Sequence, residues 1–328
     1  MTGRICLLEG KFEEGGPRRE ASGRGRPGKE PQKRVIRLRH ILHPVRAARS
    51  AYGRVGDYFF KTQARRKFRD LRRGVRERCW CGGSLGEFRW HESYGVCAAC
   101  GCYINRRPPL AKELKRIYSF DLYWHTRQRL KGFPQIEQRP ANDRADGRVE
   151  FWLGLIERHA PRRGRVVEIG CAHGGLLGEL CTRGYECIGV EPDAQTAAWV
   201  RERTGLDVRA GLFPEVDLPA CDLFLAFDVL EHSPDPVGFL QRAARLLAPG
   251  GVAIVQAPID RYAMQPPFGE RFRDAFDDVE HLQLFTDRAM AELARRAGLQ
   301  VVSMSERLWL HHEIVVMKRA VANGEQEV

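Results

Sequence analysis

The feature that most constrains the fold is an alternation of short apolar runs with longer amphipathic segments between residues 165 and 258. The apolar runs are "RVVEIG", "ECIGVEP", "LDVRAG", "CDLFLAFDVLEH" and "VAIVQAP". They have the length of strands, and the segments between them have the period of helices. A further helical segment and two more apolar runs follow. This alternation predicts an α/β fold with a mainly parallel sheet covered on both faces.

The turn after the first strand, in "VVEIGCAHGGLL", indicates a nucleotide-binding unit but leaves its ligand open. Gly170, Ala172 and Gly175 nearly complete a GxGxxG pattern, which is a weak signal by itself. A dinucleotide site uses its middle glycine to bring the pyrophosphate close to the backbone, and Ala172 stands there. Glu168 would repel a pyrophosphate but suits a cationic ligand without phosphate, such as S-adenosylmethionine. Glu191 follows the second strand, where a carboxylate can bind both ribose hydroxyls.

Four stretches together resemble the class I S-adenosylmethionine-dependent methyltransferases: "VVEIGCAHGGLL", "GVEPD", "CDLFLAFDVLEHSPDP" and "FLQRAARLLAPGGVAIVQAP". The resemblance covers residues 151–320. It implies a Rossmann-like class I methyltransferase fold with a seven-stranded sheet in the order 3-2-1-4-5-7-6 and the last strand antiparallel. The helix ending in "LLAPGG" is a particularly specific part, because Pro249 and the two glycines end the helix and reverse the chain.

The resemblance also implies which residues bind the cofactor. Ala172 replaces the family's usual middle glycine. Asp228, after the fourth strand, would stand at the mouth of the pocket, with a turn or cap carboxylate as the alternative. The full expected set is Glu168, Gly170, Ala172 and Gly174 around the methionine, Glu191 at the ribose, Phe213 at the adenine edge, and Asp228.

The acceptor side is expected to use histidine. Methyl transfer from a sulfonium is an in-line displacement, so the protein mainly aligns the reactants and removes a proton if the acceptor is a hydroxyl. His232 in "LEHSPDP" and His281 in "EHLQLFT" are the candidates for that base. The second segment resembles one found after the fifth strand in many sugar and small-molecule methyltransferases. The alternative for His281 is that it only anchors a lid. The pair His311–His312 is expected at the surface or the core edge.

The reaction expected from these features is O-methylation of a sugar, a glycan precursor or a related small metabolite. Methylases of base amino groups resemble one another in an Asn/Asp-Pro-Pro-aromatic loop, where this chain reads "DVLEH". RNA carbon-5 enzymes need a cysteine near the acceptor, whereas Cys221 precedes the fourth strand. Three alternatives stay open: a ribosomal RNA methyltransferase that uses the basic N-terminal arm, a non-catalytic S-adenosylmethionine-binding module, and a dehydrogenase that binds NAD, against which Glu168 argues.

A cysteine-rich module precedes this domain. Cys79 and Cys81 are followed, after fifteen residues, by Cys97 and Cys100, and both pairs end in Cys-Gly. Four such thiolates suit one tetrahedral zinc ion. The first pair is one residue shorter than the common Cys-x-x-Cys, so Cys102 stays an alternative ligand. "CGCYINRRPP" resembles part of the N-terminal zinc ribbon of methyltransferases from bacterial glycan and deoxysugar biosynthesis, which implies a structural zinc.

The basic charge is concentrated in the first quarter of the chain. Residues 1–78 contain 23 Lys and Arg against 8 Asp and Glu, while the whole chain has a net charge of +12. We expect a disordered basic tail over residues 1–34 and a basic helical arm over residues 35–78. The apolar residues at helical spacing in the arm are Ile41, Leu42, Val45, Phe68, Leu71 and Val75.

The expected division then continues with a zinc-ribbon-like module over residues 79–109 and a helical linker or lid over residues 110–150, with a loop at 132–147. The methyltransferase domain follows. The expected partner is a small-molecule or glycan-precursor acceptor. Nucleic acid or an anionic membrane surface stays open as a partner of the arm. No run approaches the ~20 apolar residues of a membrane-spanning helix and no secretion signal is evident, so a cytoplasmic location is expected.

Overall fold

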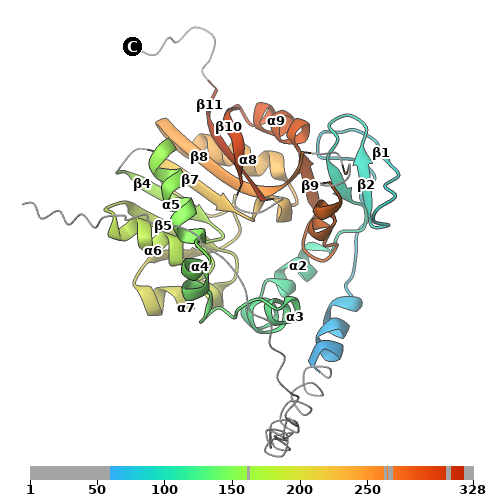
Figure 1. Ribbon diagram of the computed structural model, residues 1–328, viewed down its shortest axis with the longest axis horizontal. Coiled ribbons are helices and arrows are strands. Elements are labelled where there is room, and N and C mark those ends of the chain that lie inside the picture. Colours follow the sequence, from blue (N-terminus) through green and yellow to red (C-terminus); the bar gives the residue numbers. More distant parts are fainter. Residues whose placement is uncertain (1–59, 161–162, 262–263, 265–268, 308–311, 321–328) are drawn as a thin grey trace, which may run out of the picture. The chain divides into compact units, whose positions relative to one another are not determined.

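The computed structural model of this chain describes residues 60–160, 163–261, 264, 269–307 and 312–320 (Figure 1). The expected disordered tail and the apolar positions Ile41, Leu42 and Val45 of the arm lie outside the described residues. None of the helices in the described ranges is long and apolar enough to cross a membrane.

A mainly parallel sheet forms the centre of the fold, because the apolar runs of the α/β segment pair side by side. Seven strands follow the order β6-β5-β4-β7-β8-β11-β10, which is the order that the family resemblance implies. β11 runs antiparallel to both of its neighbours. The bounds are β4 Arg165–Ile169, β5 Glu186–Glu191, β6 Asp207–Ala210, β7 Cys221–Phe227, β8 Leu247–Asp260, β10 Leu299–Arg307 and β11 His312–Arg319.

Five helices cover the two faces of this sheet (Figure 1). Successive residues of β7 point to opposite faces, so that Phe224 packs with α8 and α9, while Leu223 and Leu225 pack with α5, α6 and α7. Side-chain caps fix where three helices begin, because Asp193, Asp235 and Thr286 each accept a backbone N–H of the first turn. The bounds are α5 Arg148–His159, α6 Gly175–Thr182, α7 Ala194–Thr204, α8 Pro236–Leu246 and α9 Asp287–Arg296.

The cysteine-rich module extends the sheet beyond the seven expected strands. Its strands β1 (Leu85–Gly86), β2 (Tyr94–Cys97) and β3 (Tyr103–Asn105) are antiparallel, and β3 pairs with β9 (Gln283–Thr286). β9 in turn runs parallel to the end of β8. The described residues therefore form one sheet of eleven strands, and the expected count of seven is too low. The difference arises because β9 is short and its pairing with β3 joins residues far apart in the chain.

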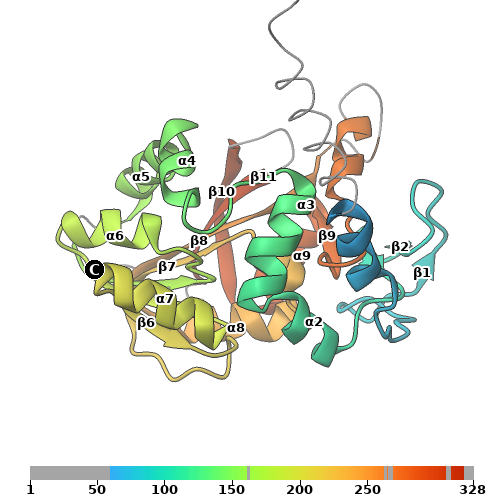
Figure 2. The same ribbon diagram turned by 90° about the horizontal axis from the view of Figure 1, so that it is seen from below.

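A helical layer precedes the methyltransferase segment, as expected for residues 110–150. The loop expected at 132–147 is wrong in part, since α4 occupies its second half. Pro140 fits there because a helix tolerates proline in its first turn. The bounds are α2 Ala111–Ile117, the π-helix η1 Asp121–Gln128, α3 Arg129–Lys131 and α4 Arg139–Ala145. Figure 2 shows α2 and α3 beside the helix at 60–69.

The arm is helical only over 60–69 within the described residues, so the helix expected to run to 78 is wrong in its last part. Phe68 and Leu71 are buried against Leu114 and Ile117 of α2. Val75, in contrast, is 79% exposed. The apolar spacing of Phe68, Leu71 and Val75 misleads here because the N–H of Gly74 bonds to the carbonyl of Pro108, which holds this stretch extended.

Candidate active site

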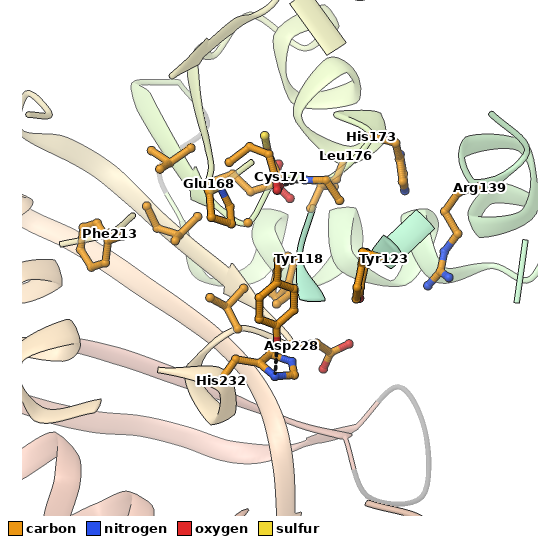
Figure 3. A pocket seen from close by; sticks show the side chains of 18 of the residues that line it. Tyr118, Tyr123, Arg139, Glu168, Cys171, His173, Leu176, Phe213, Asp228 and His232 are labelled. Carbon is orange, nitrogen blue, oxygen red and sulfur yellow. Dashed lines mark hydrogen bonds between the residues drawn. The ribbon is translucent and has the colours of Figure 1, made fainter. Parts of the chain in front are cut away.

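A cavity of about 290 Å³ lies at the carboxyl ends of β4, β5 and β7 (Figure 3). Ligands of open α/β sheets bind at this edge, beyond the ends of the parallel strands. Of the nine cofactor-binding and catalytic residues expected from the sequence, seven line this cavity: Glu168, Gly170, Ala172, Glu191, Phe213, Asp228 and His232. Gly174 and His281 do not line it.

The turn between β4 and α6 has a backbone that passes three times through the left-handed region. Gly170, Ala172 and Gly174 have φ of 68°, 51° and 73°. A Cβ on Gly170 would stand 2.7 Å from Val229 Cγ2, and a Cβ on Gly174 would stand 2.8 Å from Val200 Cγ1. Gly170 therefore lets the backbone pass close to Val229 at the cavity wall. Gly174 lets Val200 of α7 pack against the start of α6. Ala172 adopts the same conformation despite its Cβ.

Two buried carboxylates face the cavity from neighbouring strands. Glu168 and Glu191 are each 7% exposed. Burial raises the pKa of Glu168 to about 8, and burial also raises the pKa of Glu191 to about 8 although backbone N–H groups oppose the shift. Glu191 Oε2 accepts the N–H of Ala172 at 3.2 Å, while Glu168 Oε2 has no partner within the described residues. A buried carboxylate with an unsatisfied oxygen favours a ligand that brings a positive charge or hydroxyl donors.

Phe213 closes another side of the cavity. The centroid of its ring lies 4.7 Å from the ring centroid of Phe239 and 5.4 Å from that of Phe224. The side chain therefore joins the sheet core at one end and presents an apolar edge to the cavity at the other (Figure 3).

Asp228 is held by two side-chain partners. Its Oδ2 accepts from Gln256 Nε2 at 2.9 Å, and its Oδ1 lies 2.8 Å from His312 Nδ1. Burial opposes ionisation of Asp228, but the charge and hydrogen bond of His312 prevail and hold the pKa of Asp228 below its usual value. His312, expected at the surface or the core edge, is half-buried at the start of β11. Its contact with Asp228 could not be predicted from the local sequence, because Asp228 is 84 residues away. His311 lies outside the described residues.

His232 stands at the opposite wall of the cavity from Glu168 (Figure 3). Its Nδ1 lies 2.9 Å from the carbonyl oxygen of Glu280 and 2.9 Å from the hydroxyl of Tyr118. Burial lowers the pKa of His232 to about 4, so its imidazole is neutral near pH 7. With Nδ1–H donated to the carbonyl oxygen, Nε2 keeps a free lone pair.

His281 lies behind His232, with 4.9 Å between the two ring centroids. Its Nδ1 donates to the carbonyl oxygen of Ala275 at 2.6 Å, which ties together the loop before β9. Burial lowers the pKa of His281 to about 3. This placement favours the anchoring alternative over direct contact with an acceptor in the cavity.

The helical layer supplies lining residues that the sequence reasoning missed. Tyr118, Tyr123 and Trp124 come from the segment "YSFDLYW", and Arg139 and Trp152 come from α4 and α5. The concentration of aromatic residues in that segment was the available signal. Figure 3 shows Tyr118, Tyr123 and Arg139 on the side of the cavity away from Phe213.

The helical layer is tied to the loop that carries His281 by a buried ion network. Arg127 binds Glu280 and also binds both oxygens of Asp277, at 2.7 and 2.6 Å. Lys131 Nζ lies 2.8 Å from Asp277 Oδ2 and 3.1 Å from Glu280 Oε2. Two cations thus face two carboxylates across the interface, which holds the wall near His232 in place.

Four cysteines of the N-terminal module converge at a second place in the fold. Cys79 Sγ lies 3.6 Å from Cys100 Sγ, and Cys81 Sγ lies 3.4 Å from Cys97 Sγ. All four sulfur atoms lie within 4.8 Å of one another. Thiolates bound to one tetrahedral zinc at ~2.3 Å are about 3.8 Å apart, so these cysteines fit such an ion. Cys102 instead points to the carbonyl oxygen of Leu284 at 3.1 Å and is fully buried.

Residues 137–304 match the family model described as a methyltransferase domain. A Mycolicibacterium smegmatis protein named a probable S-adenosylmethionine-dependent methyltransferase is 32% identical, over 42% of this chain and 52% of the relative. A Rhodopseudomonas palustris ubiquinone biosynthesis O-methyltransferase is 36% identical, over 49% of this chain and 71% of the relative. This chain thus spans about half the length of the first relative.

Among solved structures, a TehB-like S-adenosylmethionine-dependent methyltransferase of Corynebacterium glutamicum is similar with a TM-score of 0.42 and 17% identity. The match covers 56% of this chain and 95% of that one. The family match spans the strands and turns that build the cavity, from the helical layer to β10. The chain belongs to the methyltransferase-domain family of S-adenosylmethionine-dependent enzymes.

Proposed function

We propose that this protein transfers a methyl group from S-adenosylmethionine to a hydroxyl of a sugar, a glycan precursor or a related small metabolite. The observation that carries the proposal is the pair Glu168 and Glu191, two buried carboxylates that face one cavity from adjacent strand ends. Their charge suits a ligand with an ammonium, a sulfonium and ribose hydroxyls.

The cofactor would occupy the side of the cavity formed by β4 and β5. Glu191 would accept hydrogen bonds from both ribose hydroxyls, and Glu168 would face the cationic methionine part beside the Gly170–Ala172 turn. Phe213 would pack on the adenine edge. Asp228, held by Gln256 and His312, would stand between the cofactor and the acceptor.

The acceptor would occupy the side formed by the helical layer. Tyr118, Tyr123 and Trp152 give rings on which a sugar or another flat metabolite can pack, and Arg139 gives donors for its oxygens. The 36%-identical Rhodopseudomonas palustris relative is named an O-methyltransferase, that is, an enzyme that methylates oxygen. The same class of acceptor atom is proposed here.

The transfer would form an oxygen–carbon bond as the sulfur–methyl bond breaks, with the bonding electrons leaving on sulfur to give S-adenosylhomocysteine. The acceptor hydroxyl would lose its proton. His232 Nε2 is the proposed partner of that hydroxyl, since its Nδ1 is engaged by the carbonyl of Glu280. His281 is proposed as a positioning residue for the loop behind His232.

A structural zinc ion is proposed at Cys79, Cys81, Cys97 and Cys100. The ion would cross-link the turns of the module without an open coordination position. Gly83, two residues after Cys81, serves this packing, because a Cβ on Gly83 would stand 2.6 Å from Cys97 Sγ.

The direct test is methyl transfer by the purified full chain. S-adenosylmethionine labelled in the methyl group is incubated with nucleotide sugars, simple glycans, phenolic metabolites and total RNA, and labelled products and S-adenosylhomocysteine are measured. Label in a hydroxyl of a small acceptor supports the proposal, and its loss in Glu191→Ala ties it to this cavity. Label in RNA alone, or cofactor binding with no transfer to any acceptor, contradicts it.

A further inference from the structure

Three side chains with metal-binding atoms meet beside the acceptor wall of the cavity. Glu231 and His232 come from the short turn after β7, and His281 comes from the loop before β9. One carboxylate oxygen and two imidazole nitrogens lie within 4.8 Å of one another. The distance from His232 Nε2 to Glu231 Oε1 is 3.8 Å. Ligand atoms that each lie ~2.1 Å from one ion are about 3 to 4 Å apart. A small movement of the three side chains toward one another would therefore bring their ligand atoms to these distances.

Both histidines are oriented as metal-binding histidines usually are. His232 donates Nδ1–H toward the carbonyl of Glu280, and His281 donates Nδ1–H to the carbonyl of Ala275. In each ring the carbonyl fixes the tautomer that leaves the Nε2 lone pair free. Two neighbouring imidazoles whose tautomers are fixed by backbone carbonyls can therefore both bind one metal ion through Nε2.

Glu231 gives a second, independent observation that points to a cation here. Its side chain is fully buried, and neither carboxylate oxygen has a hydrogen-bond partner within the described residues. The backbone around it is firmly held, since its carbonyl accepts the N–H of Leu282 at 2.9 Å. A buried carboxylate with two unsatisfied oxygens is costly unless it takes up a proton or a cation compensates it, and two neutral imidazoles beside it make a shared cation the compensation that fits this place.

We propose that Glu231, His232 and His281 bind a divalent transition-metal ion of the Mn²⁺, Fe²⁺, Co²⁺ or Zn²⁺ class. One carboxylate and two imidazoles are ligands that these ions share, whereas Mg²⁺ and Ca²⁺ prefer oxygen alone. Three protein ligands leave coordination positions for water or for an oxygen of a bound molecule. This site is separate from the four cysteines, which would hold zinc by sulfur alone.

The position of the site suggests its use, and this part rests on the proposed function. His232 lines the cavity beside Tyr118 and Asp228 (Figure 3), whereas Glu231 and His281 do not line it. An ion held by the three would therefore lie in the cavity wall at His232, and its open coordination positions would have to reach the acceptor past that ring. A hydroxyl oxygen bound to such an ion loses its proton at a lower pH. His232 would then act through the ion, and an acceptor with two adjacent oxygens would be favoured because both can bind it.

The test is Mn²⁺ binding to the full chain, with zinc retained at the cysteines. Mn²⁺ is chosen because it prefers oxygen and nitrogen to thiolate. The loss of the free Mn²⁺ signal in electron paramagnetic resonance gives stoichiometry and affinity. We expect one Mn²⁺ per chain, at least tenfold weaker binding in Glu231→Gln and in His281→Asn, and a rise in Tm with Mn²⁺ only where it binds. His125→Asn, which changes a histidine outside the cluster, should bind like the parent chain.

Absence of Mn²⁺, Co²⁺ and additional Zn²⁺ binding overturns the proposal, as does binding that both cluster variants leave unchanged. Methyl transfer measured in parallel separates this result from the proposed function. Transfer that proceeds fully in a chain shown to contain only the cysteine-bound zinc leaves the methyltransferase proposal intact and overturns the metal site. Mn²⁺ bound through Glu231 without methyl transfer supports the metal site and counts against the proposed function.

Discussion

Nδ1 of His312 lies 2.8 Å from Oδ1 of Asp228, which connects the start of β11 to the turn after β7 at the edge of the cavity. The same carboxylate accepts from Gln256 Nε2, and Gln256 Oε1 accepts from Trp152. The relay therefore fixes Asp228, whose backbone has a φ of 54°. It also makes part of the stability of the cavity wall depend on pH.

We expect His312→Gln to lower the free energy of unfolding by about 1 kcal/mol at pH 6, since the pair is only partly buried. The histidine pKa is raised by Asp228 despite burial, so its contribution is complete below 6.5 and is lost as pH rises through the folded pKa. The Asp228 pKa is lowered, so its contribution is complete above 3.8 and is lost in acid. Urea unfolding at pH 6 and pH 9 measures this: the loss should be larger at pH 6, and an equal loss at both would refute the pairing.

Cofactor affinity should rise with pH between about 6 and 8. Burial raises the pKa of Glu168 and of Glu191 to about 8 in the free protein, and a cationic ligand favours their charged forms. Binding then releases protons, and affinity gains up to about tenfold per pH unit for each proton released. Calorimetry in buffers of different ionisation enthalpy detects the release. Affinity that is flat or falls over this range would show that these carboxyls are not what the cofactor binds.

The tight turn after β4 should not tolerate a side chain at Gly170. Gly170→Ala puts a Cβ 2.7 Å from Val229 Cγ2 at a φ of 68°. Gly184→Ala is the matched control, because Gly184 also has a positive φ, 88°, but has open space around its Cβ position. Strain alone costs about 1 kcal/mol. Thermal unfolding and cofactor titration should show a larger loss for Gly170→Ala in both measurements, and equal losses would mean that the contact with Val229 is unimportant.

The sequence was informative where the signal is local. Strand and helix periodicity and the positions of Glu168 and Glu191 at strand ends are read from residues close together in the chain, and these predictions agree with the fold and the cavity. Contacts between distant segments left no such signal. Ile104 pairs with Gln283, and His312 pairs with Asp228, because folding brings those segments together.

The helical layer shows the same limit. Its helical character was visible, but the cavity-facing positions of Tyr118, Tyr123 and Arg139 depend on how α2, η1 and α4 pack over the sheet edge. The spacing of Phe68, Leu71 and Val75 extended the expected helix too far, because three residues are too few to define a period and the helix ends at residue 69. Whether Cys102 belongs to the zinc ligands could be decided only from the fold. Its Sγ points to the carbonyl oxygen of Leu284 in β9, and the other four cysteines form the cluster.

The cysteine cluster should contain one zinc ion per chain. Cys100→Ser should remove that zinc and lower Tm, because the ion would cross-link two turns of the module. Cys181→Ser is the control, since Cys181 is an exposed cysteine outside the cluster. Metal analysis of the purified chains, followed by thermal unfolding, decides the matter. A full zinc content in Cys100→Ser would show that the metal is bound elsewhere.

The most direct measurement is calorimetric titration of S-adenosylmethionine into the full chain and into Glu191→Ala. The chain should bind one molecule of cofactor, and the substitution should weaken binding by ~1–3 kcal/mol, the cost of losing charge-assisted hydrogen bonds to the ribose. That loss is about 5- to 150-fold in Kd. Equal affinity in the two chains, or uptake of a nicotinamide dinucleotide in place of S-adenosylmethionine, would contradict the assignment of this cavity.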